Sequence, residues 1–157
     1  MKKLLNYAFL ILMSINIVSC GYQLRGVDEL TFKAISITGG SPSFTKILNK
    51  KFKQSGIKIN VENAEKYIEI INDTYSKVIL SLSSAGKVQE YKITYKVSFR
   101  VKLKESGWGD PINIEAKRDY TYDDKNIIAK TEEESRIIKG MQEQLIRNMI
   151  TQISLSK

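Results

Sequence analysis

The sequence predicts an α+β protein, a two-layer sandwich with two helices packed on one face of a mainly antiparallel, four-stranded sheet. Between Glu90 and Glu105, apolar and polar residues alternate strictly, which is typical of a long strand with one buried face. Two further segments, 41–56 and 131–153, repeat apolar residues at helical spacing. Because each apolar surface needs a partner, we expect the helices to cover the apolar face of the sheet.

The segment 34–56 predicts a short strand followed by a helix. Residues 34–38 alternate between apolar and polar side chains. Ser41 suits a helix N-cap, Pro42 suits the first helical position, and Gly56 suits the end of the helix. The apolar residues of this helix share one face: Phe44, Ile47, Leu48 and Phe52.

The middle of the chain predicts further strands joined by turns. Residues 57–61 alternate, and residues 67–82 are rich in strand-forming side chains. In the second of these segments the alternation changes phase near Ile70 and Ile71, which indicates a bulge or a bend. A turn around Gly86 then leads into the long strand.

The carboxy-terminal part predicts a strand over 112–122 and then the second helix. Thr131 and Glu134 match a capping box, so we expect the helix to begin there. Its apolar face consists of Ile138, Met141, Leu145, Met149 and Ile153. The expected element order is β-α-β-β-β-β-α.

The composition argues against an enzyme. The chain of 157 residues has no His and a single Cys, so the most common general base and any internal disulfide are missing. No nucleophile elbow, P-loop or zinc-protease motif occurs. We therefore expect no enzymatic activity, no cofactor and no metal site. The formal net charge of +8 favours an anionic partner without identifying it.

The first twenty residues are typical of an exported lipoprotein. A short positive start and an apolar run predict a cleaved signal peptide over 1–19, too short for a membrane-spanning helix. "IVSC" resembles the bacterial lipobox, in which the final Cys, here Cys20, carries the lipid. The alternative is an incidental buried thiol. Several acyl chains, palmitate included, would anchor the domain 20–157 stably. The residue after Cys20 is Gly21, whereas an Asp at this position would resemble an inner-membrane retention signal. The sequence therefore favours the outer membrane.

The polar face of the long strand is strongly basic. Its outward cations are Lys92, Lys96, Arg100, Lys102 and Lys104. On the next strand, Glu115 and Asp119 are too few to neutralise them, so we expect a surplus of positive charge. The face is either a solvated surface that keeps the protein soluble or a binding surface for an anion.

Four segments together resemble the LptE family of lipopolysaccharide-assembly lipoproteins. They are "CGYQLRG" (20–26), "VQEYKITYKVSFRV" (88–101), "AKRDYTYDD" (116–124) and "NIIAKTEEESRIIKGMQEQLIRNMI" (126–150). The resemblance implies two helices on a four-stranded sheet. It also implies a lipid-anchored outer-membrane protein that plugs the lumen of the LptD β-barrel as a heterodimer. Such a protein helps the barrel assemble and binds lipopolysaccharide during transport to the outer leaflet.

The resemblance also implies binding residues. Lys130 falls on the Lys of the family's Ala-Lys step, a position associated with lipopolysaccharide contact. The family's other basic residue, in the turn before the long strand, is replaced here by Ser84, and Lys87 is a candidate substitute. Lys92, Lys96 and Arg100 are further candidates for lipopolysaccharide binding, and they suit contacts with polar side chains of the barrel wall equally well. Each could also be an ordinary solvated charge. Trp108 either covers the end of the sheet or anchors the protein to the barrel or membrane.

Two other functional classes are consistent with parts of the sequence. A nucleic-acid-binding sheet exposes its aromatic rings, whereas Tyr91, Tyr95 and Phe99 share the apolar register, so we expect no nucleic acid partner. An unrelated periplasmic-side lipoprotein, acting as a scaffold or as an anionic-ligand binding module, would share the lipobox and the fold class. It would differ by failing to co-purify with a large barrel.

Overall fold

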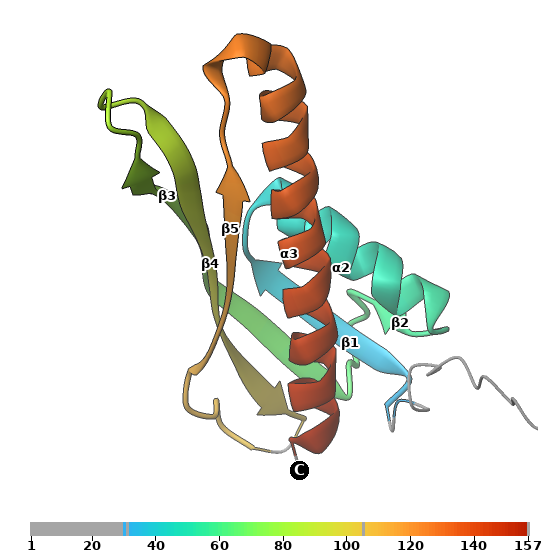
Figure 1. Cartoon of the computed structure of the whole chain (residues 1–157). Coiled ribbons are helices and arrows are strands. Elements are labelled where there is room, and N and C mark those ends of the chain that lie inside the picture. Colours follow the sequence, from blue (N-terminus) through green and yellow to red (C-terminus); the bar gives the residue numbers. More distant parts are fainter. Residues whose placement is uncertain (1–29, 31, 105, 157) are drawn as a thin grey trace, which may run out of the picture.

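The computed structural model describes residues 30, 32–104 and 106–156, which form one five-stranded sheet with two helices (Figure 1). The signal peptide, "CGYQLRG" and Cys20 lie outside the described residues. The elements in chain order are β1 (Ala34–Gly39), α2 (Pro42–Gln54), β2 (Lys58–Ile59), β3 (Lys66–Leu82), β4 (Val88–Leu103), β5 (Ile112–Thr121), the 3₁₀ turn η2 (Asp124–Asn126) and α3 (Ile127–Leu155).

The sheet is mixed, with the strand order β2-β1-β3-β4-β5. β1 runs parallel to both β2 and β3, whereas β4 is antiparallel to both of its neighbours, β3 and β5. The expectation of four mainly antiparallel strands is therefore wrong in strand number and partly in direction, although the α+β class holds. The reason is α2, which carries the chain back along β1, so that β2 and β3 both run in the direction of β1.

β3 contains the irregularity that the phase change predicted. Its pairing with β4 shifts register between Ile70 and Asn72, so Ile71 is the extra residue and is 50% exposed. Ile68 and Ile70 point into the core before the shift. After it, the odd-numbered residues from Asp73 onward lie opposite the buried face of β4.

The two helices cover the face of β4 that the alternation assigned to the core (Figure 1). α2 contributes Phe44, Leu48 and Phe52, each fully buried. The buried β4 residues are Ile93, Tyr95, Val97, Phe99 and Val101, and those of α3 include Met141, Leu145, Met149 and Ile153. Each such side chain contributes roughly 1.5–3 kcal/mol before chain entropy is subtracted. Tyr91 is only partly buried because it lies near the end of the layer.

The predicted start of α2 is confirmed, whereas that of α3 is wrong. Ser41 caps α2, and its side chain accepts a hydrogen bond from the Phe44 amide. α3 begins at Ile127, because the chain passes directly into it from η2. Thr131 consequently lies inside the helix and donates its hydroxyl hydrogen bond to the Ile127 carbonyl, 2.9 Å away. Glu134 is therefore free to bond elsewhere.

The carboxyl end of α3 is fixed by a lysine from β3. Lys66 is 7% exposed, and its Nζ donates to the carbonyl oxygens of Ile153 and Ser156, both at 2.6 Å. These carbonyls lack partners within the helix, and a cation suits the negative end of its dipole. Burial lowers the pKa of Lys66, although Glu65 partly opposes that effect.

Candidate functional site

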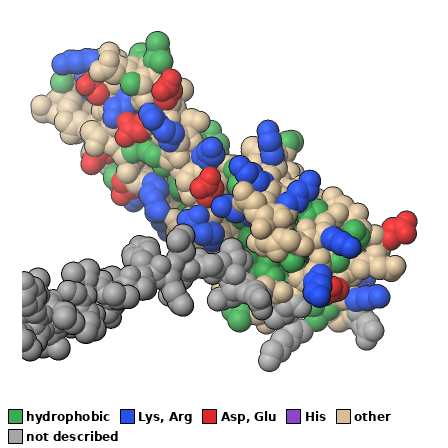
Figure 2. Space-filling model, turned by 90° about the vertical axis from the view of Figure 1, so that its right-hand side faces the viewer, with side chains coloured by type: hydrophobic (Ala, Val, Ile, Leu, Met, Phe, Trp, Pro, Cys, Tyr) green, Lys and Arg blue, Asp and Glu red, His purple; other side chains and the backbone are tan. Residues whose placement is uncertain are grey.

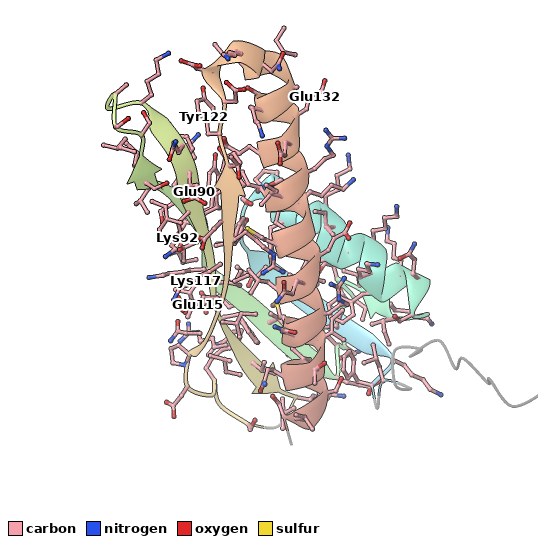
Figure 3. The ribbon with its side chains drawn as sticks, in the orientation of Figure 1. Glu90, Lys92, Glu115, Lys117, Tyr122 and Glu132 are labelled. Atoms are coloured by element: carbon pink, nitrogen blue, oxygen red, sulfur yellow. The ribbon has the colours of Figure 1, made fainter. Side chains whose placement is uncertain are left out.

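The outer face of the sheet, opposite the helices, mixes both signs of charge. Figure 3 shows Lys92, Glu115 and Lys117 on the side of the sheet away from α3. Across the β4–β5 ladder, Lys92 lies opposite Asp119 and Lys96 lies opposite Glu115. Glu115 bonds to Lys117 at 2.7 Å, and this bond, aided by the charge of Lys96, lowers the Glu115 pKa.

The expected surplus of positive charge is smaller than the sequence indicated. Glu69 of β3 lies opposite Arg100 in the ladder, and the Arg100 Nε donates to its carboxylate. The guanidinium also stacks on the ring of Trp108, 4.8 Å from the ring centroid. Glu69 was not predicted as a partner of Arg100, because the register between β3 and β4 depends on the bulge. Among the described residues, Lys92 and Lys96 take part in no ion pair.

Lys87 and Lys130 lie at the same end of the molecule. Lys87 follows the Gly86 turn between β3 and β4, where Ser84 is exposed, and its Nζ reaches Asp124 of η2 at 3.0 Å. Lys130 in the first turns of α3 donates at 2.8 Å to both the Thr121 carbonyl and Glu133. The side chain of Lys87 is 69% exposed and that of Lys130 is 20% exposed. The hydrogen bond to Asp124 raises the Lys87 pKa and lowers the Asp124 pKa.

A tyrosine cluster supports this end of the molecule. Tyr91 stacks on Tyr120 with ring centroids 5.8 Å apart and meets Tyr122 edge-on at 5.2 Å. The Lys77 Nζ lies 4.6 Å from the centroid of the Tyr91 ring and bonds to Glu134 at 2.8 Å. This cluster holds the β3–β4 hairpin against α3, which fixes Lys87 and Lys130 relative to each other.

Glu134 is the hub of the cluster. It accepts a 2.7 Å hydrogen bond from the Tyr120 hydroxyl as well as the bond from Lys77. Burial alone would raise the pKa of the Glu134 carboxyl, but the bonds from Lys77 and Tyr120 outweigh it and lower that pKa. Burial, reinforced by Glu134, raises the Tyr120 pKa well above its usual value. In the sequence, only the phase change at Ile71 points to this hub. The resulting bulge turns Lys77 toward the helices, where a charged side chain needs an acidic partner.

Trp108 lies in the loop after β4 and pairs with Lys102 as an isolated bridge. The ring is 41% exposed and rests against Arg100 on the outer face. It therefore covers part of the sheet end while leaving a large aromatic surface in contact with solvent. No helix among the described residues is long and apolar enough to cross a membrane, and no metal-binding cluster occurs in that part of the chain.

The model of the lipopolysaccharide-assembly family LptE matches residues 32–153. The chain belongs to the LptE family. The predicted resemblance is thus confirmed, and membership of this family supports a role in lipopolysaccharide assembly. No curated protein gives a significant match to this chain.

Solved structures of related lipoproteins have the same fold. A lipoprotein B from Nitrosomonas europaea is 28% identical, covers 85% of this chain and 90% of its own, and superposes with a TM-score of 0.72. The rare lipoprotein B from Shewanella oneidensis is also 28% identical, covering 76% of this chain and 92% of its own with a TM-score of 0.67. A minor lipoprotein from Acinetobacter baumannii, 20% identical, covers 80% and 92% with a TM-score of 0.64 and supports the fold.

Proposed function

We propose that this protein is a lipid-anchored component of the outer membrane that occupies the lumen of an LptD β-barrel. There it helps the barrel to assemble and binds lipopolysaccharide on its way to the outer leaflet. Cys20 would carry the acyl chains after removal of residues 1–19. The single observation that carries this proposal is the family match over residues 32–153.

The end of the molecule that contains Lys87 and Lys130 supports lipopolysaccharide binding. Both ammonium groups are held by partly exposed acids, Lys87 by Asp124 and Lys130 by Glu133. A phosphate of the glycolipid can replace either carboxylate as the partner, and charge-assisted bonds of that kind are strong. The half-buried position of Lys130 makes its charge less screened than that of Lys87.

The outer face of the sheet supports a second contact. Lys92 and Lys96 are available to an incoming anion, whereas Arg100 is held between Glu69 and Trp108. A barrel lumen is polar, so acidic groups of the barrel wall suit this face as well as the glycolipid does. We assign Lys92 and Lys96 to the wall contact, because they lie on the outer face of the sheet with Glu115 and Asp119, whereas Lys130 lies on α3 on the other side.

A titration of purified lipopolysaccharide against the double variant Lys87→Glu, Lys130→Glu tests the binding end. We expect affinity to fall about tenfold or more, because two charge-assisted bonds are replaced by repulsion. The matched control is Lys58→Glu, an exposed lysine of the edge strand β2. Equal affinity for the wild type and the double variant, both folded by circular dichroism, would exclude this end as the binding site.

A further inference from the structure

One half of β3 is an unpaired sheet edge. β1 pairs with β3 only as far as Ile70, whereas β4 continues beside β3 to Leu82. Within the described part of the chain, residues 71–82 therefore have a neighbouring strand on one side only (Figure 1). Such an edge presents a row of backbone N–H and C=O groups that fits another extended chain.

This edge lacks two of the usual protections against strand addition, proline and free charge, although bulges interrupt its pairing with β4 at Ile71 and near Leu80. It contains no proline, and its two charged residues are already engaged inside the molecule, Asp73 with Ser41 and Lys77 with Glu134. It exposes an unusual amount of apolar surface instead: Ile71 50%, Tyr75 52%, Val78 54%, Ile79 54%, Leu80 41% and Leu82 54%. These side chains lie on both faces of the strand, so exposed apolar surface borders the edge on both sides, and exposed apolar surface of this kind marks an interaction surface.

A cleft of about 1210 Å³ lies beside the edge, between α2 and α3, and Tyr75 and Lys77 form part of its wall. Four further basic residues come from the two helices, namely Lys46, Lys50 and Lys51 of α2 and Lys139 of α3. None of these lysines takes part in an ion pair among the described residues. Figure 2 shows Lys and Arg side chains spread over this side of the molecule.

The acids in the cleft offset only part of the charge of these lysines. Asp73 accepts a 2.7 Å bond from the Ser41 amide, another from the Ser41 hydroxyl and one from the Tyr95 hydroxyl. Glu134 is bonded to Lys77 and Tyr120. Only Glu143 remains among the acidic residues of the lining. The lining has five lysines and three acids, so the cleft beside the edge is positive overall.

We propose that an extended acidic segment of a partner protein binds here as an added strand beside residues 71–82. Its backbone pairs with the free edge of β3, and its acidic side chains meet the lysines of α2. A lipid or a free anion would satisfy the lysines but not the row of backbone groups. A second copy of this chain fits poorly. Antiparallel pairing of two β3 edges would place both helix layers on the same side, with their lysines facing each other.

The proposal does not use Lys87 or Lys130 and does not depend on lipopolysaccharide binding. The probe is a synthetic ten-residue peptide of alternating Glu and Val, added to the full-length protein in detergent and followed by fluorescence anisotropy and backbone hydrogen exchange. We expect binding, with new protection of amides within 71–82. The double variant Lys46→Glu, Lys50→Glu should weaken binding about tenfold, as two exposed ion pairs do together. The control Lys53→Glu, on α2 but outside this cleft, should bind normally.

Two backbone-methylated forms of the peptide separate strand addition from simple charge attraction. Each carries N-methyl groups on alternate residues, so that one form blocks one edge of the peptide and the second form blocks the other edge. Strand addition predicts that one form loses binding while the other keeps it. Equal binding of both forms, or equal binding of a Lys-Val peptide, would overturn the proposal. Concentration-dependent protection of 71–82 without peptide would assign the edge to a second copy and overturn it too.

Discussion

The two halves of β3, separated by the bulge at Ile71, show how one strand serves two purposes. In the lower half, residues 66–70 before the bulge, Ile68 and Ile70 lie inside a five-stranded sheet and are at most 3% exposed. In the upper half, residues 72–82 after the bulge, β3 has one neighbouring strand, and Val78 and Ile79 are both 54% exposed. The lower half stabilises the fold. The upper half is held by a small polar and aromatic cluster and presents the surfaces to which we assign binding.

The largest expected effect is a difference in unfolding free energy between truncations beside the two halves of β3. Phe99→Ala, in the fully buried layer opposite Ile70, should lower the free energy of unfolding by about 3–5 kcal/mol. Ile79→Ala, on the exposed half, should change it by less than about 0.5 kcal/mol. Urea denaturation followed by circular dichroism measures both. Similar losses for the two variants would contradict the division.

The next effect concerns the clamp at the end of α3. Lys66→Met keeps the apolar stem but removes both bonds to the Ile153 and Ser156 carbonyls. We expect a loss of about 1–3 kcal/mol, because buried carbonyls lose a charged donor. Lys58→Met on the exposed edge strand is the control. Hydrogen exchange should locate the loss in the last turn of α3, and an unchanged last turn would argue against the clamp.

A smaller, pH-dependent effect tests the cluster of the upper half. The Glu134 pKa is lowered from its usual 4.5, so the unfolded chain takes up this proton first. The stabilisation by Glu134 is thus complete above pH 4.5 and is lost as the pH falls through the folded pKa. Hydrogen exchange in the β3–β4 hairpin should show this loss in the wild type but not in Glu134→Gln. Glu132→Gln, whose side chain points away from the sheet (Figure 3), should behave as the wild type.

The smallest expected effect is on the stability of the outer face. The double variant Lys92→Ala, Lys96→Ala should leave the thermal midpoint nearly unchanged, because neither lysine takes part in an ion pair in the described part of the chain. Under our assignment it reduces the recovery of the barrel partner and leaves lipopolysaccharide affinity unchanged. The reverse pattern, measured on the same preparation, would move the glycolipid to this face.

Local periodicity was enough to predict much of the fold. The buried face of β4, the Ser41 cap and the bulge near Ile71 all depend on neighbours along the chain, and all are confirmed. The parallel strands depend on how α2 returns the chain, which periodicity does not encode. Thr131 shows the limit of a short motif, since its spacing to Glu134 matched a capping box inside a continuing helix.

The candidate site was less predictable for the same reason. That Lys87 and Lys130 share one end follows from the position of the β3–β4 turn beside η2. Glu69 neutralises Arg100, and Glu134 bonds Tyr120, only because strands and helix from distant parts of the chain meet. Sequence alone therefore identified the basic residues but overestimated the charge that they leave free.

Affinity purification of the tagged, full-length protein from outer membranes tests the central claim most directly. We predict that one large β-barrel protein co-purifies in equimolar amount, and that intact mass spectrometry places acyl chains on Cys20. Recovery of an acylated protein without any barrel would contradict the proposed function and leave a lipoprotein that acts outside a barrel.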